Sequence, residues 1–177
     1  AVEGALALMR DHDVRADQIS KINVETFHEA KRLATIPTTT EQAQYSLPFP
    51  VAAAVVRGTV GVAEVTADGL TDPQIIALAK MVEISEDDTF NAAFPARRFA
   101  RTHFLLTDGR ILSSDVTEAQ GDPEAKLDDH VVWNKFRSLT VPVMGAEWSE
   151  TFLKTARTIA DAPSVAPMFD LMAQPPK

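Results

Sequence analysis

The side chains best suited to contact a ligand gather in one short stretch, residues 42–46, with the sequence QAQYS. Pro48 and Pro50 follow at once, and each lacks the N–H group that a continuous helix needs. Residues 51–56 are small and apolar, and Gly58 offers a left-handed helix end. A polar cluster at the entry of a buried alanine and valine helix is able to aim side chains at a ligand. We therefore treat this stretch as a candidate binding site.

A predicted helix start precedes the polar stretch. Thr38 and Glu41 have the spacing of a capping box, in which a threonine and a glutamate satisfy the free N–H groups of a helix start. Capping boxes are common, so the same residues also fit a plainer interpretation, a capped helix with a surface turn and no ligand. The local pattern alone favours this plainer interpretation.

The spacing of the four histidines does not indicate a catalytic site. The spacing between His12, His28, His103 and His130 is not that of a metal site. His103 shares a predicted strand face with Arg101, a pairing more typical of a sheet surface than of an active base. No nucleophile elbow, phosphate-binding loop or dinucleotide fingerprint occurs. The residues alone therefore indicate a ligand-facing loop, with no catalytic residue and no metal ligand assigned.

A small sheet is predicted around two stretches that alternate between apolar and polar residues. Residues 22–26 alternate as a half-buried strand does. Residues 99–106 alternate in the same way, and Asp108-Gly109 supplies the tight turn of a hairpin with a return strand over 111–116. Together these strands predict a small, mostly antiparallel sheet.

Helices are expected around this sheet. The order of elements predicts an α+β fold in which a small, mostly antiparallel sheet has helices packed on one face. Residues 1–160 are expected to form this domain, and residues 161–177 a proline-rich C-terminal tail that frays after a short turn near Met168. The helices are predicted over residues 1–12, 51–58, 73–81, from about 127 to breaks at Pro142 and Gly145, and 146–159.

Composition and charge exclude several classes of protein. The chain has 177 residues, the length of one domain, and a hydrophobic fraction of 45% that allows a real core. The net charge of −8 argues against nucleic acid or an anionic membrane as a partner. No run approaches the roughly 18 apolar residues of a membrane span. The absence of cysteine excludes disulfides and thiolate chemistry, and it fits a cytoplasmic location.

The first residues indicate a piece of a longer polypeptide. The chain has no initiator methionine, and Val2, Ala5, Leu6 and Met9 already follow the spacing of a buried helix face. Removal of a methionine before Ala1 is the alternative explanation. We favour an excised piece, because the signals of a helix start are missing.

Several short segments occur in a characteristic order. In that order and rough spacing they resemble the MmgE/PrpD family, which includes 2-methylcitrate dehydratase and cis-aconitate decarboxylase. The resemblance covers the C-terminal half of the family, from near residue 1 to about residue 139. The segments are residues 37–39 (PTT), 41–49 (EQAQYSLPF) with 51–52 (VA), 70–73 (LTDP), 94–97 (FPAR), 107–109 (TDG) and 121–123 (GDP).

The resemblance implies a lid-type α+β domain. Family members carry a large helical domain before it, which supplies most acid–base residues, and a family lysine and histidine would precede Ala1. The family pattern E-A-x-x-S-[FL]-x-Y presents an aromatic hydroxyl to the substrate. Ala43, Ser46 and Leu47 match this pattern, whereas Phe49 occupies the tyrosine position.

The resemblance also implies site residues. A substrate-contact role carries over to Gln44, Tyr45, Ser46 and Phe49, with Tyr45 about one helical turn before the missing hydroxyl. No catalytic residue and no metal ligand carries over.

The activity implied by the resemblance is that of a cofactor-independent lyase. Such a dehydratase acts on a small polycarboxylate such as 2-methylcitrate by proton abstraction next to a carboxylate. The family usually forms homodimers, and the isolated chain, lacking the helical domain, would be inactive. Two alternatives stay open: an epimerase or isomerase of the same family, and a non-catalytic ligand-binding or interaction domain.

Overall fold

The chain divides into two compact units. A computed structural model describes residues 1–122 and 125–174. The first unit is Ala1–Ala119 and the second is Gln120–Lys177. The boundary expected at residue 160, between the domain and a tail, stays a prediction.

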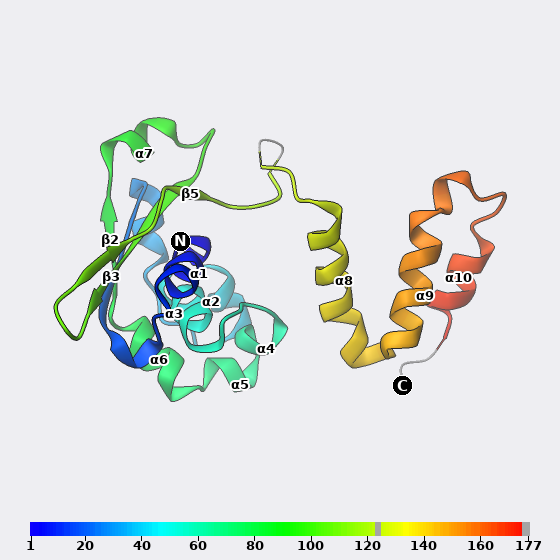
Figure 1. Cartoon of the computed structure of the whole chain (residues 1–177), viewed down its shortest axis with the longest axis horizontal. Helices are drawn as coiled ribbons and strands as arrows, with labels where there is room; N and C mark the ends of the chain where they lie inside the picture. The colour runs from blue at the N-terminus through cyan, green and yellow to red at the C-terminus, as the bar shows by residue number, and fades with distance from the viewer. Residues whose placement is uncertain (123–124, 175–177) are drawn as a thin grey trace. The chain divides into compact units, whose positions relative to one another are not determined.

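The first unit is built on a five-stranded sheet with the order β2-β1-β3-β4, in which β5 also pairs with β3 (Figure 1). Strands β1 and β2 are parallel, and all the other pairings are antiparallel. The predicted α+β fold with a mostly antiparallel sheet is therefore confirmed. The strands are β1 (Ile19–Thr26), β2 (Val82–Glu86), β3 (Phe99–Leu106), β4 (Ile111–Ser113) and β5 (Thr117–Glu118).

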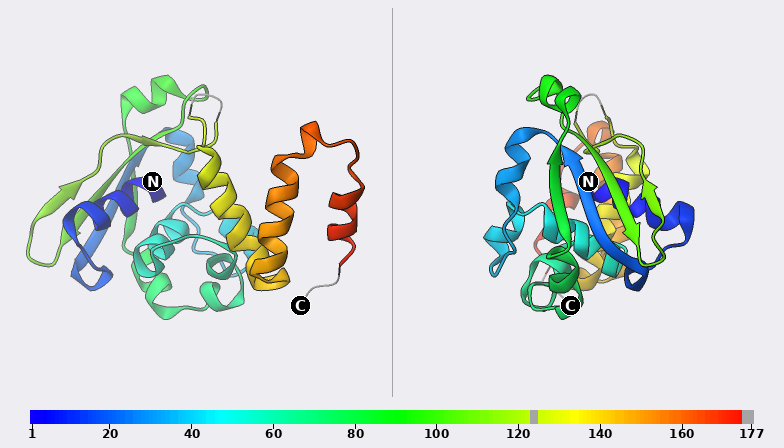
Figure 2. Two further views of the ribbon diagram at one scale, coloured as in Figure 1. Left: turned by 45° about the vertical axis from the view of Figure 1, so that its right-hand side comes forward. Right: turned by 90° about the vertical axis from the view of Figure 1, so that its left-hand side faces the viewer.

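Alternating side chains give the sheet one buried face. In the register of β1 with β3, Ile22 lies opposite Phe104 and Val24 lies opposite Thr102. All four side chains are fully buried. Figure 2 shows β2, β1 and β3 side by side. The intervening positions, such as Glu25, are only half-buried, so period-2 alternation correctly predicted which strand residues face the core.

Helices of the first unit cover the buried face. Helices α1 and α3 pack on each other, α3 packs on α6, and α1 contacts β3. The prediction of a helix beginning at Pro73 is confirmed, because the Asp72 carboxylate accepts hydrogen bonds from the N–H groups of Gln74 and Ile75. The helices are α1 (Val2–His12), α2 (Thr40–Gln44), α3 (Pro48–Arg57), α4 (Val62–Val65), α5 (Ala67–Leu70), α6 (Pro73–Ala79) and α7 (Asp88–Ala93), with 3-10 turns at Ala16–Gln18 and His28–Leu33.

A glycine lets α1 lie close to the sheet. A Cβ atom at Gly4 would stand 2.8 Å from Ser114 Oγ and 2.9 Å from Thr102 Oγ1, closer than ordinary contacts allow. Thr102 is itself buried, and its hydroxyl donates to the carbonyl oxygen of Ala1 at 3.0 Å. The first helix is therefore fixed to β3 by a close approach and by a buried hydrogen bond.

The second unit is helical. It contains α8 (Asp129–Met144), α9 (Ala146–Arg157), a 3-10 turn (Ile159–Asp161) and α10 (Ala166–Met172). The predicted break at Gly145 is confirmed, because α8 ends at Met144 and Gly145 caps it with a φ of 84°. The predicted break at Pro142 is wrong, because α8 continues past this residue. Near the end of a helix a proline removes only one backbone hydrogen bond. In the expected tail, Pro167 lies in the first turn of α10, where no N–H is needed, so a helix forms instead of a short turn.

Some of the sequence expectations fall on residues outside this description. Pro123 of the GDP segment and residues 175–177 of the expected tail lie outside the described residues. Among residues 1–122 and 125–174, no helix combines the length and the apolar character needed to cross a membrane.

Candidate functional site

The candidate site begins with the cap of helix α2. The N-cap predicted at Thr38 lies one residue later, because Thr39 has the extended backbone of an N-cap and its hydroxyl accepts a hydrogen bond from Gln42 N at 3.3 Å. Thr38 has another role. Its backbone N–H and its hydroxyl donate to Gln42 Oε1 at 2.8 and 3.1 Å. Both threonines thus fix the start of α2.

A tight corner joins α2 to α3. Ser46 Oγ accepts a hydrogen bond from Phe49 N at 3.2 Å, and Leu47 N donates to Leu33 O at 2.8 Å. Helix α3 already begins at Pro48 rather than beyond Pro50, since the first turn of a helix needs no N–H groups. The sequence predicted that Pro48 and Pro50 interrupt the helix, but the break between α2 and α3 lies before them, at residues 45–47.

The four predicted contact residues separate into two pairs. Gln44 and Tyr45 project outward, and 70% of Tyr45 is exposed. Ser46 is buried, and Phe49 is fully enclosed. Neither the Gln44 amide nor the Tyr45 hydroxyl has a hydrogen-bond partner among the residues that the structure describes. The corner thus presents two polar side chains that are free to meet a ligand.

Phe49 has the place of a core residue. It belongs to the main hydrophobic cluster together with Val51, Ile22 and Phe104. A tyrosine hydroxyl buried at this position would need a hydrogen-bond partner inside the core. Phenylalanine fits without one, so its departure from the family pattern is compatible with the packing of this domain.

Helices α4 and α5 pack against α2, the helix that leads into the corner. The buried carboxylate of Glu64 accepts a hydrogen bond from Gly61 N at 2.7 Å. Gly69 passes so close to this turn that a Cβ atom there would stand 2.0 Å from Glu64 O. The backbone of α4 and α5, which contact α2, is therefore tightly packed.

An ion pair joins the far end of α3 to α6. Arg57 Nη2 donates to Asp72 Oδ2 at 2.5 Å. The Arg57 guanidinium lowers the pKa of the Asp72 carboxyl, and the N–H groups of Gln74 and Ile75 lower it further. Because Asp72 also caps α6, one carboxylate holds both helices in place.

Three of the four histidines have polar partners. His28 Nδ1 lies 3.2 Å from Glu86 Oε2, His103 Nδ1 lies 2.8 Å from Ser113 Oγ, and His130 Nδ1 lies 2.6 Å from Asp128 Oδ1. Within the described ranges, no three histidine, aspartate or glutamate side chains lie close enough to hold a metal ion together.

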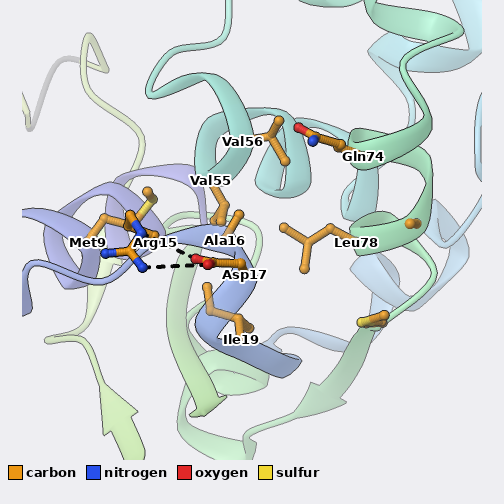
Figure 3. A pocket seen from close by; sticks show the side chains of 11 residues that line it. Met9, Arg15, Ala16, Asp17, Ile19, Val55, Val56, Gln74 and Leu78 are labelled. Carbon is orange, nitrogen blue, oxygen red and sulfur yellow. Dashed lines mark hydrogen bonds and ion pairs between the residues drawn. The ribbon is translucent and has the colours of Figure 1, made fainter. Parts of the chain in front are cut away.

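The sequence did not reveal a pocket in the first unit. Its volume is about 620 Å³, and Figure 3 shows Val55, Ile19 and Leu78 around it, with Arg15 and Asp17 at one side. Periodicity predicted Met9 only as a buried helix position. Apolar spacing identifies residues that avoid water, but it does not separate those that line a cavity from those that fill the core.

Comparison with known proteins identifies the family. The family model of the MmgE/PrpD C-terminal domain matches residues 1–161, most of the chain. A comparison with curated proteins finds no match. The match includes the whole first unit and extends through helices α8 and α9 of the second. The chain therefore belongs to the MmgE/PrpD family, and residues 1–161 are its C-terminal domain.

Proposed function

We propose that this chain covers the substrate in a cofactor-independent lyase, a dehydratase that acts on a small polycarboxylate such as 2-methylcitrate. The family match supports this assignment. The observation that carries it is the corner between α2 and α3, from which Gln44 and Tyr45 project with no partners among the described residues. The Ser46 hydroxyl fixes that corner by accepting a hydrogen bond from Phe49 N, and the Phe49 ring anchors it in the hydrophobic core.

The two outward side chains suit a carboxylate-rich substrate. The Tyr45 hydroxyl and the Gln44 amide both donate hydrogen bonds, and bonds to a carboxylate oxygen are stronger than bonds between neutral groups. In the reaction, negative charge develops on the substrate when a proton leaves the carbon next to the carboxylate, and donors aimed at that charge lower the barrier.

The proposal assigns the proton transfer to neither side chain. The corner therefore binds and orients the substrate, and the proton goes to a base on the helical domain that precedes this domain in the family. In this proposal the enzyme is a cytoplasmic homodimer, and the 177-residue chain is inactive by itself.

Product analysis with the longer polypeptide, which includes the helical domain, tests the assignment. We expect 2-methylcitrate or citrate to lose water and give an unsaturated polycarboxylate. Deuterium uptake from heavy water without loss of water or carbon dioxide would instead identify an epimerase. Robust turnover by the 177-residue chain alone would contradict the proposed division of roles between the two domains.

A further inference from the structure

The pocket of the first unit has the anatomy of a small-ligand site. Its volume of about 620 Å³ lies within the range of about 300–1,000 Å³ that is usual for such sites. The pocket is not lined by any of the four predicted contact residues, Gln44, Tyr45, Ser46 and Phe49. The cavity lies instead between the end of α1, the 3-10 turn at Ala16–Gln18, the end of α3 and the exposed side of α6.

The floor of the pocket is aliphatic. Ile19, Val55 and Leu78 are buried, whereas Met9 and Met81 add apolar surface that is partly exposed to solvent. Ile19, Val55 and Leu78 border an open space in Figure 3. Aromatic residues are absent from the lining within the described chain. A branched alkyl group would remove this apolar surface from water, which favours binding.

The rim carries one positive and one negative charge. Arg15 Nε lies 3.3 Å from Asp17 Oδ1, and each of these side chains is 71% exposed. Figure 3 shows both at the same side of the cavity. Exposed ion pairs of this kind contribute little to stability, so a ligand is able to exchange partners with them. Gln74 adds a neutral amide at the rim.

We propose that this pocket binds a small zwitterion with an aliphatic side chain, that is, a free amino acid of the leucine type. The alkyl group occupies the floor formed by Ile19, Val55 and Leu78. The α-carboxylate pairs with Arg15 and the α-ammonium group pairs with Asp17. This binding site is additional to the proposed lyase function and does not depend on it.

Charge complementarity selects this class of ligand. An aliphatic anion would gain a partner in Arg15, but its carboxylate would lie beside that of Asp17. An aliphatic cation would gain Asp17 and be repelled by Arg15. Like charges at such short range disfavour binding, whereas a zwitterion satisfies both side chains. A dicarboxylate or tricarboxylate would place two or three negative charges against the apolar floor and beside Asp17, which disfavours its binding.

Methyl NMR titration of the 177-residue chain tests the proposal with three probes that share one alkyl group. Leucine carries both charges, 4-methylpentanoate only the carboxylate, and 3-methylbutylamine only the ammonium group. We expect leucine to shift the methyl signals of Ile19, Val55 and Leu78 with half-saturation on the order of 1 mM. Each of the other two probes should bind about tenfold more weakly.

Matched variants separate this site from general weak binding. Arg15→Gln and Asp17→Asn should each weaken leucine binding about tenfold. Arg10→Gln is the control, because Arg10 also forms an exposed ion pair with its neighbour Asp11 but does not line the pocket. Asp17→Asn should in addition strengthen the binding of 4-methylpentanoate.

Three results would overturn the proposal. The first is an absence of shifts at the floor residues up to about 50 mM leucine, far above the expected half-saturation. The second is equal binding of leucine and 4-methylpentanoate. The third is an equal loss of affinity in Arg15→Gln and Arg10→Gln. Because the readout is binding to this chain, none of these results depends on whether the polypeptide is a lyase.

Discussion

The two units of the chain reach stability by different means. The first unit encloses a large apolar core around the sheet, with fully buried residues such as Ile22, Phe49 and Phe104. In the described part of the second unit, only Ser149 and Leu153 are buried. The second unit instead exposes large apolar side chains, among them Phe169, which is 63% exposed.

Contacts between half-buried aromatic rings hold the second unit together. Phe152 stacks on Phe136 and on Trp148, with ring centroids 5.4 and 4.9 Å apart. The Arg157 guanidinium lies 3.9 Å from the centroid of the Trp133 ring. Such contacts contribute about 0.5–1.5 kcal/mol each beyond the apolar surface that they bury, and half-buried rings bury less of that surface than the enclosed core of the first unit does. We therefore expect the first unit to be the more stable of the two.

Truncation of a core phenylalanine should have the largest effect. Phe49→Ala should lower the free energy of unfolding of the first unit by about 4 kcal/mol, because it removes a fully buried ring. The exposed Phe169 of the second unit is the matched control, and Phe169→Ala should change stability by less than about 0.5 kcal/mol. Denaturant titration followed by circular dichroism measures both variants. Similar losses in the two variants would refute the contrast between the units.

A methyl group added at Gly69 should have the next largest effect. Gly69→Ala should destabilise the first unit by about 3 kcal/mol, because the new Cβ atom would collide with the backbone of Glu64. Gly61→Ala is the control, since its Cβ atom would meet only Glu64 Oε2, at 3.4 Å. If both variants unfold at the same denaturant concentration, the tight packing of Gly69 against Glu64 is not present in solution.

A smaller effect is expected from the buried hydroxyl of the second unit. Ser149 Oγ donates to Gly145 O at 2.8 Å and accepts from the Thr140 hydroxyl at 2.9 Å. Ser149→Ala should lower the stability of this unit by about 1 kcal/mol, whereas the exposed Ser138→Ala should have little effect.

Tryptophan fluorescence isolates this change, because Trp133 and Trp148, the two tryptophans of the chain, both lie in the second unit. The unfolding transition of the second unit, followed by tryptophan fluorescence, should also occur at a lower denaturant concentration than that of the first unit, followed by circular dichroism. Coincident transitions in every variant would mean that the units unfold as one.

Acid should weaken a surface cluster of the first unit. Hydrogen bonds from Lys31 and His28 lower the pKa of Glu86 from 4.5 to about 2. The pKa is lower in the folded state, so the stabilisation from Glu86 is complete above about pH 5 and is lost as the pH falls toward 2. In this window, Glu86→Gln should flatten the pH dependence of the first unit's stability. Glu147→Gln, a change in the other unit, should leave that profile as it was.

Local signals in the sequence predicted much of the fold. Asp72 before Pro73 began a helix as predicted, Asp108-Gly109 turned a hairpin, and Gly58 ended α3 with a φ of 73°. Each of these signals depends on the backbone preferences of one or two residues. Their structural outcome is therefore determined locally, and the sequence shows it directly.

The site was harder to predict because tertiary packing decides it. Helix α3 is apolar on every side at residues 51–55, so periodicity could not show that Phe49 faces the core. The cap moved from Thr38 to Thr39 because either threonine can accept a helix N–H. The separation of Gln44 and Tyr45 from Ser46 and Phe49 appears only when the corner is folded.

The most direct test of the proposed function is the catalytic efficiency of corner variants in an enzyme that joins this chain to the helical domain that the proposal assigns to it. Tyr45→Phe and Gln44→Met should each lower kcat/KM for the polycarboxylate about 10- to 100-fold, the effect of losing one hydrogen bond to a charged group. Glu41→Gln, an exposed change in the same helix, is the control and should stay within about twofold of the parent. Unchanged kcat/KM in both corner variants would contradict substrate contact at this corner.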